Sequence, residues 1–366
     1  MALSKIEADS LDIGQVGGRR NLIINGAMQV AQRGTSVTVG GVGGSGYRAV
    51  DRFSVFNPID LIAEQSSDSP DGFTYSCKIT KNTTSTTSTS SIGGFRYGVE
   101  LQDIYQLAYG TSSAKTITLS FYVKSSHAGT YNVLALNHGG DTQRQLTKLY
   151  TIDSTDTWEY KTLTFSGDTA FAGHTDASNT MGISLDFICT PSTAWGNGTV
   201  NTSGWADNVT SSRISTSQAN ALQSNGDYFA ITGVQLEVGS VATPFEHRSY
   251  GEELQLCKRY FQIVQSSVTP LIATGHAYNT STSYFPFRFE QEMRDAPGVT
   301  STVDSGNGFR FRSGGTTHDK TGIPIRENID TKGCRFANNQ NTITTGSVWD
   351  IQIISSTAKI NMDAEL

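Results

Sequence analysis

Proline and cysteine are scarce in this sequence, and so are charged residues. Only 8 prolines and 4 cysteines occur in 366 residues, and Asp, Glu, Lys and Arg together make up 16%. The cysteines, Cys77, Cys189, Cys257 and Cys334, are scattered without the paired spacing of a disulfide framework or a zinc site. We therefore expect four buried thiols and no metal held by cysteine.

Long hydrophobic runs are also missing. The first fifteen residues carry Glu7, Asp9 and Asp12 and no apolar stretch, so they match neither a secretory signal nor a transmembrane helix. We expect a protein made in a cytosol and not inserted in a membrane.

Clusters of basic residues are absent as well. The formal net charge is −6, whereas proteins that bind nucleic acid gather Lys and Arg to replace the counterions of the phosphates. The charge pattern excludes nucleic acid as the principal partner.

Motifs for catalysis or for cofactors are not found. Gly41 to Gly46 has the spacing Gly-x-Gly-x-x-Gly, but Tyr47 to Phe53 then looks like a strand, whereas a dinucleotide site needs a helix there. No phosphate-binding loop, nucleophile elbow or His-Glu-x-x-His pair occurs. We predict no catalytic residue, no metal and no cofactor. A glycosidase needs only two facing carboxylates, and the sequence leaves open whether the fold brings two together.

The residues that are present indicate a β protein. Glycine is frequent, with 37 residues, and apolar residues alternate with others over 117–123 and 181–189, the period-two pattern of strands that bury one face. A chain of this length has room for two domains. The composition predicts an all-β protein.

A short helix is expected between the two domains. Ser249 and Glu252 have the spacing of a capping box. Apolar residues then recur every three or four positions, which predicts a narrow helical stripe; they are Leu254, Cys257, Phe261 and Val264. The stripe could pack on a sheet of the same chain or lie on a symmetry axis against copies of itself, and the pattern does not separate the two.

Two surfaces are candidates for recognition. Trp195 and Trp205 lie in a polar, Gly-rich loop, where an aromatic face could stack on a sugar ring; the alternative is that both anchor their loop. From residue 267 onward short strands resume, and this second unit offers another contact surface, formed by Tyr278, Tyr284, Arg288 and Arg310. The sequence does not rank the two surfaces.

Two segments carry a resemblance to a known family. Asn21 to Gly34 and Ile231 to Ser249 both read as strands closed by turn residues, and together they resemble the first and last strands of a jelly-roll domain repeated through bacteriophage tail fibres and other virion appendages. That domain is related to the sugar-binding modules of polysaccharide-degrading enzymes. The Phe-Pro-Phe strand at 285–287, followed by Met293 to Pro297, resembles the terminal domain that follows the jelly roll in phage appendage proteins.

The sequence departs from the related sugar-binding modules where those modules hold calcium. The related sugar-binding modules often hold a structural calcium ion through acidic residues near these two strands. This chain has Ala27, Met28 and Gln29 at the first position and Thr232 and Gly233 at the second. Because calcium prefers carboxylate oxygens, the departure puts that ion in doubt.

The resemblance implies the following organisation. Residues 1–20 form an attachment peptide that docks on another virion protein, residues 21–247 a jelly roll, residues 248–266 a connecting helix, and residues 267–366 a smaller β-rich domain. The implied function is a non-enzymatic tail fibre or receptor-binding protein of a tailed phage, located in the virion, trimeric, and in contact with host cell-surface polysaccharide. The alternatives are a head fibre, collar or decoration protein that binds no sugar, and a polysaccharide depolymerase.

Overall fold

The computed structural model describes residues 19–41, 44–139, 142–175, 178–265, 270–323, 325–339 and 343–366, so residues 1–18 of the predicted attachment peptide lie outside the described residues. The chain divides into two compact units. Unit 1 comprises residues up to Glu253 together with Leu366, and unit 2 comprises Leu254–Glu365. No helix in the described part of the chain is long and apolar enough to cross a membrane.

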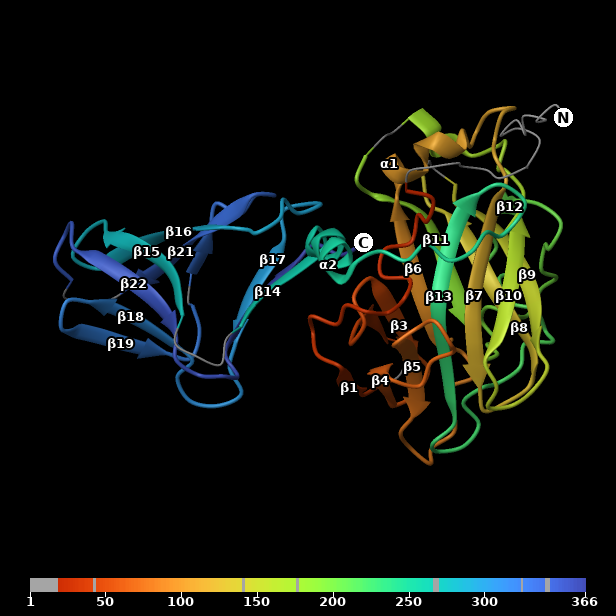
Figure 1. Ribbon diagram of the computed structural model, residues 1–366, viewed down its shortest axis with the longest axis horizontal. Coiled ribbons are helices and arrows are strands. Elements are labelled where there is room, and N and C mark those ends of the chain that lie inside the picture. Colours follow the sequence, from red (N-terminus) through yellow and green to blue (C-terminus); the bar gives the residue numbers. More distant parts are fainter. Residues whose placement is uncertain are drawn as a thin grey trace, which may run out of the picture. The chain divides into compact units, whose positions relative to one another are not determined.

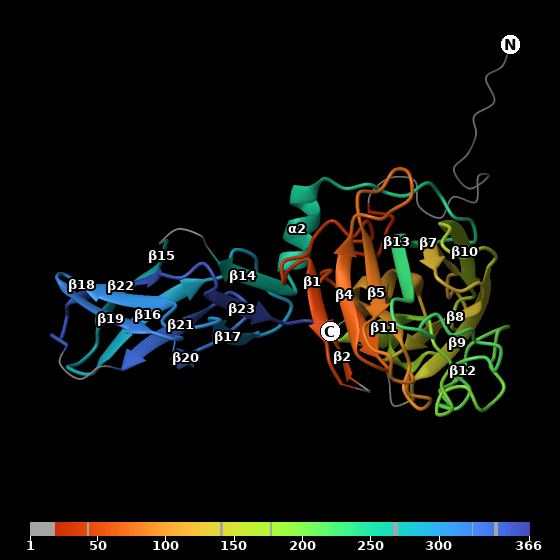
Figure 2. The ribbon, with the colours of Figure 1, turned by 90° about the horizontal axis from the view of Figure 1, so that it is seen from below.

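Unit 1 is a sandwich of two antiparallel sheets (Figure 1). The six-stranded sheet runs in the order β1 (Ser36–Val39), β4 (Leu61–Ser66), β5 (Ser76–Lys81), β13 (Tyr228–Val238), β7 (Ile117–Ser125), β10 (Glu159–Phe165). The seven-stranded sheet runs in the order β12 (Ala206–Asp207), β9 (Arg144–Ile152), β8 (Gly129–Asn137), β11 (Met181–Ile188), β6 (Gly94–Glu100), β3 (Phe53–Asn57), β2 (Gly44–Tyr47). Short helical turns lie at one end: α1 (Leu101–Ile104), η2 (Tyr105–Leu107), η3 (Ala172–Thr175). Figure 2 shows the two sheets as two layers.

The main core lies between these layers. Phe95 of β6 and Phe229 of β13 come from different sheets, and their ring centroids are 6.0 Å apart; Phe121 of β7 and Phe187 of β11 meet at 5.1 Å. All four side chains are fully buried. The alternation predicted for 117–123 and 181–189 thus places one face of each strand in this core, and the prediction of an all-β jelly-roll sandwich is confirmed.

Residues 21–24 do not form the strand that the sequence predicted before Asn25 and Gly26. The turn predicted at Asn25 is present, since its φ angle is 62°, and Met28 also has a positive φ, 58°. The segment still runs along β13, where Leu22 N donates to Leu236 O and Val234 N donates to Gly26 O. The Asn21 side chain replaces further ladder bonds, since its oxygen accepts from Leu236 N. Side-chain hydrogen bonds therefore hold this segment in place of a strand ladder.

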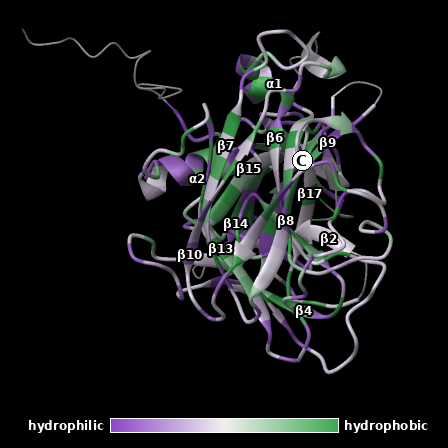
Figure 3. Ribbon diagram, turned by 90° about the vertical axis from the view of Figure 1, so that its right-hand side faces the viewer, coloured by the Kyte–Doolittle hydropathy of each residue, from purple (hydrophilic) through white to green (hydrophobic). Residues whose placement is uncertain are grey.

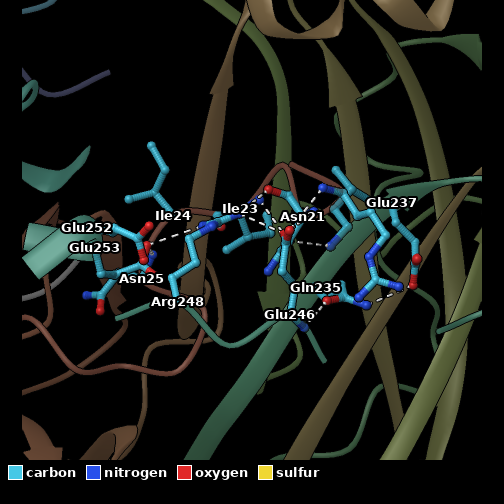
Figure 4. A network of polar contacts seen from close by, with 12 residues as sticks. Asn21, Ile23, Ile24, Asn25, Gln235, Glu237, Glu246, Arg248, Glu252 and Glu253 are labelled. Atoms are coloured by element: carbon cyan, nitrogen blue, oxygen red, sulfur yellow. Dashed lines mark hydrogen bonds and ion pairs between the residues drawn. The ribbon is translucent and has the colours of Figure 1, made fainter. Parts of the chain in front are cut away.

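A group of charged and amide side chains joins this segment to the end of unit 1 (Figure 4). Arg248 donates to the carbonyls of Asn21 and Ile23 and pairs with Glu246 and Glu253. Glu246 in turn accepts from Asn21 N at 2.8 Å, and Glu253 accepts from the N–H of residue 25 at 2.6 Å. We call this group of Asn21, Glu246, Arg248 and Glu253 the clasp. Burial by itself would raise the pKa of Glu246. Hydrogen bonds from the backbone and the charge of Arg248 outweigh burial and hold this pKa below its usual value.

β13 contains a bulge at Gly233. Its register against β7 shifts between Thr232 and Gln235, so one extra residue is accommodated on β13. Gly233 has φ 60°, and a Cβ there would lie 2.7 Å from the Phe73 ring. Glycine is needed both for the backbone angle and for the space.

The predicted connecting helix is shorter than the sequence suggested. α2 spans Tyr250–Lys258, and its start confirms the capping box, because Glu252 accepts from the backbone and side chain of Ser249. Phe261 and Val264 do not continue the helix; they lie in β14 (Phe261–Gln265), which pairs with β23 (Lys359–Asp363). The prediction that all four apolar residues form a stripe on one helix is therefore wrong. Backbone pairing of residues 261–265 with β23 outweighs the helical spacing of their apolar side chains. Figure 3 shows α2 as mainly hydrophilic.

Unit 2 is also built of antiparallel sheets. One has the order β14, β23 (Lys359–Asp363), β17 (Gly298–Thr302). The other has the order β19 (Thr316–Lys320), β18 (Phe309–Ser313), β22 (Val348–Ile353), β15 (Leu271–Ala277), β16 (Thr282–Arg288), β21 (Gly333–Asn339), β20 (Ile325–Glu327). Phe285, Phe311, Phe336 and Ile351 are fully buried in a core of its own.

Candidate functional site

A cleft of about 370 Å³ opens on the outward face of the seven-stranded sheet in unit 1. β-strand alternation explains its floor: the odd positions of β6 and β11, such as Phe95 and Phe187, enter the main core, so Arg96 and Asp186 point to the opposite face. The long loop between β11 and β13 contributes Trp195 to the wall of the cleft.

An ion pair forms the floor. Arg96 Nε and Nη2 donate to Asp186 Oδ1 and Oδ2, both at 2.6 Å, and the Asp186 side chain is fully buried. The guanidinium also lies 4.8 Å from the centre of the Phe56 ring. Burial alone would lower the pKa of Arg96, but the Asp186 carboxylate that faces the guanidinium outweighs burial and raises it. This arginine is charged and rigidly held.

A second arginine lies on the wall. Arg213 stacks over Trp195, with its guanidinium carbon 4.5 Å from the ring centre, and its Nε donates to Asn208 Oδ1 at 2.8 Å. Trp195 is half-buried and packs against a small apolar cluster of Phe56, Ile92, Ile188 and Ile214. The aromatic ring therefore supports a guanidinium that faces the cleft.

His138 is the third polar group of the cleft, and its neighbours fix its tautomer. Gln143 Oε1 accepts from Asn208 Nδ2, so the amide nitrogen of Gln143 points to His138 Nδ1 at 3.0 Å. Nδ1 accordingly accepts, and Nε2 carries the proton that it donates to Ser184 Oγ at 2.9 Å. Burial, assisted by the charges of Arg96 and Arg213, lowers the pKa of His138 to about 4. The imidazole is neutral at pH 7.

The arrangement suits the binding of a polar ligand. Hydroxyl, amide and guanidinium donors stand beside aromatic rings on a rigid sheet, the combination that orients a polar ligand. Among the described lining and floor residues Asp186 is the one carboxylate, and Arg96 occupies it. In the described part of the chain no three His, Cys, Asp or Glu side chains gather as a metal site would require.

The two predicted tryptophans have different positions. Trp195 lies in the cleft, but Arg213 covers its ring, so its contact with a sugar stays a prediction. Trp205 is not among the cleft residues: its ring packs against the main core and Tyr109, and its Nε1 donates to Ser166 O at 2.7 Å. The position of Trp205 supports the anchor interpretation rather than sugar stacking.

The predicted second surface is only partly brought together, in unit 2. Tyr278 and Tyr284 lie 5.4 Å apart between ring centres, and Arg288 lies further along the same face of β16. Arg310 is on β18, separated from β16 by β22 and β15, and forms a bidentate pair with Asp319. A binding role for this surface stays a prediction.

Sequence reasoning missed most of the cleft. Arg96, the neighbouring pair His138 and Gln143, and Arg213 come from three distant parts of the chain, and no motif joins them. One signal was available: Asp186 interrupts an otherwise apolar strand, on the face opposite to the core. A lone carboxylate in that position needs a cationic partner.

Comparisons with known proteins give no family. No family model matches the chain, and no curated protein matches it. Solved structures do match: the bacteriophage CBA120 tailspike protein 4 enzymatically active domain, at 11% identity and a TM-score of 0.31, covers 60% of this chain and 21% of its own. The CBM22-1 xylan-binding domain of Paenibacillus barcinonensis Xyn10C, at 10% identity and a TM-score of 0.28, covers 62% of this chain and 100% of its own.

A two-domain structure matches over a longer range. The N-terminal CBM22-1-CBM22-2 tandem domain of Paenibacillus barcinonensis Xyn10C covers 95% of this chain and 98% of its own, at 9% identity and a TM-score of 0.30. This chain spans about a fifth of the tailspike structure. With TM-scores this low, these likenesses do not say what the chain binds.

Proposed function

We propose that unit 1 binds a polysaccharide through the cleft on the seven-stranded sheet. The observation that carries the proposal is the joint presence of two ring-supported guanidinium groups, a neutral histidine and a glutamine amide on one open face. Sugar hydroxyl groups both donate and accept hydrogen bonds, so they match such a mixed lining.

A second hollow supports a polymeric ligand over a single sugar. It has a volume of about 320 Å³ and is lined by Thr87, Ser88 and Thr89, which precede the cleft residues Ser90 and Ser91 in the chain. The lining is rich in hydroxyl groups. A chain of several sugars could occupy both hollows, whereas a monosaccharide fills one.

Blocking the cleft tests the proposal while leaving its arginine, histidine and glutamine side chains in place. Ser45 is exposed on β2 at the rim, so Ser45→Trp should fill the opening and weaken binding on a glycan array at least tenfold. Ser36→Trp is the matched control, because Ser36 is exposed on the edge strand β1 of the other sheet. Unchanged binding in Ser45→Trp, or binding lost in Arg310→Gln of unit 2, would contradict the assignment of the site.

The wider role is proposed from the sequence resemblance. The chain acts in the virion of a tailed phage as a non-enzymatic tail fibre or receptor-binding protein, assembles as a homotrimer, and contacts host surface polysaccharide. Gold-labelled antibodies against the protein should bind the tail of intact particles. Labelling of the head would favour the head-fibre or decoration role, and light scattering that gives one chain mass would contradict the trimer.

A further inference from the structure

The two arginines of the cleft differ in how their charge is balanced. Arg96 forms a bidentate pair with the buried Asp186, so this pair contributes no net charge to the cleft. Arg213 forms no salt bridge with any described residue, and the one hydrogen bond that its side chain makes to a described residue uses Nε. The two terminal nitrogens of Arg213 therefore have no acceptor within the described part of the chain.

The other charged or titratable groups of the cleft do not neutralise Arg213. His138 is neutral at pH 7 because burial, together with the charges of Arg96 and Arg213, lowers its pKa. Asp186 is paired with Arg96, and the Asp186 carboxylate acts on Arg213 only from a distance. Burial lowers the pKa of Arg213, with the Asp186 charge opposing this shift and the Arg96 charge adding to it. The lining thus carries one unbalanced positive charge beside a partly desolvated surface.

We infer that the cleft takes an acidic saccharide, and that the terminal nitrogens of Arg213 bind its carboxylate. This inference rests on the proposed sugar-binding function and names its ligand class. A planar guanidinium with two parallel N–H groups matches the two oxygens of a carboxylate, and Trp195 beneath holds that plane in a fixed orientation. A neutral sugar would leave the cation without a counter-charge.

The test uses the full chain and paired probes. The acidic polymers are alginate, hyaluronate and polygalacturonate, each compared with the same polymer after its carboxylates are converted to methyl esters; dextran sulfate and neutral dextran form the pair for a sulfate. We expect binding to at least one acidic polymer, at least tenfold weaker binding to its ester, and an affinity that falls with added salt.

Variants separate the role of Arg213 from general charge. Arg213→Gln should weaken binding to the acidic polymer at least tenfold and flatten its salt dependence, whereas Arg213→Lys should keep part of the affinity. Lys115→Gln removes the same charge from an exposed position of unit 1 outside the cleft and should bind as the wild type does. Circular dichroism checks that each variant is folded.

The outcomes distinguish the acidic ligand from the underlying proposal of sugar binding. Equal binding to acid and ester, or binding to neutral polymers alone that Ser45→Trp abolishes, overturns the acidic ligand and leaves sugar binding in place. Preference for dextran sulfate over every carboxylate polymer overturns the carboxylate. Binding to none of the polymers, acidic or neutral, overturns both.

Discussion

At the scale of single residues, the cleft is defined by which side chains keep their charge. Asp186 is tolerated inside the sheet face because two hydrogen bonds from Arg96 replace its hydration. His138 occupies the same face by giving up its charge instead. A buried ionisable group has these two solutions, a partner or neutrality, and this sheet uses both.

The charge state of His138 predicts a pH dependence of stability. An unfolded histidine binds its proton near pH 6.5, whereas the folded protein does so only near pH 4. Between these values the unfolded chain holds the extra proton, so the free energy of unfolding rises with pH and reaches its full value above about 6.5. The change amounts to about 3 kcal/mol at most.

Urea unfolding of the full chain between pH 4.5 and 7.5 measures this change. The His138→Gln variant keeps a neutral group that can hydrogen-bond to Ser184, so its unfolding free energy should vary less over that window. A slope equal to that of the wild type would show that His138 is not the responsible group.

Few of these residue-level features were readable from the sequence. The apolar alternation over 181–189 predicted which face of β11 enters the core, and the burial of Ile183, Leu185 and Phe187 confirms it. The same alternation put Asp186 on the face opposite to the core but did not indicate what that side chain contacts. Its partner Arg96 is 90 positions away in the chain, and a pairing at that distance is decided by sheet order, which no local pattern records.

At the scale of elements, local signals succeeded where they were self-contained. The capping box at Ser249 involves four consecutive residues, and it begins α2 as predicted. The end of α2 was misjudged because Phe261 and Val264 keep helical spacing but pair with β23, about a hundred residues later. Residues 21–24 were misjudged for the same reason: the side chains of Glu246 and Arg248 bind the backbone of Asn21 from more than two hundred positions away.

The bulge of β13 gives a prediction at this scale. Gly233→Ala meets two penalties, since a positive φ costs an alanine about 1 kcal/mol and its Cβ would lie 2.7 Å from the Phe73 ring. Gly226→Ala is the matched control, because Gly226 also has a positive φ, 91°, but no atom within 4 Å of the added Cβ.

The two variants should therefore differ in stability. Chemical denaturation should show a loss of about 1 kcal/mol for Gly226→Ala and about 1–3 kcal/mol more for Gly233→Ala, the usual cost of overpacking. Equal losses would mean that the Phe73 ring moves aside without cost and that the backbone angle alone requires glycine.

At the scale of the whole molecule, the chain has two separate hydrophobic cores. The core of unit 1 draws on both sheets of the sandwich, and the core of unit 2 contains Phe285, Phe309 and Phe336. The sequence predicted two all-β units from the chain length and from the resumption of short strands after residue 267. It did not predict the unit boundary at Glu253, which lies inside a helix.

Separate cores predict separate unfolding. Phe336→Ala removes a fully buried ring from unit 2 and should cost about 3–5 kcal/mol there, and Phe187→Ala should do the same in unit 1. Scanning calorimetry of the full chain should resolve two transitions, each lowered by one variant. A single transition lowered by both would show that the units unfold together.

The clasp has a mechanical consequence. Asn21 lies near the beginning of the described part of unit 1 and Glu253 near the junction with unit 2; Arg248 bonds to both residues, while Glu246 holds the backbone of Asn21. Tension applied between these two points acts on this short cross-link and on the hydrogen bonds that join Asn21 and Leu22 to β13. The first event under load is therefore rupture of a few charge-assisted hydrogen bonds, and until they break the sheet face that carries the cleft stays unstrained.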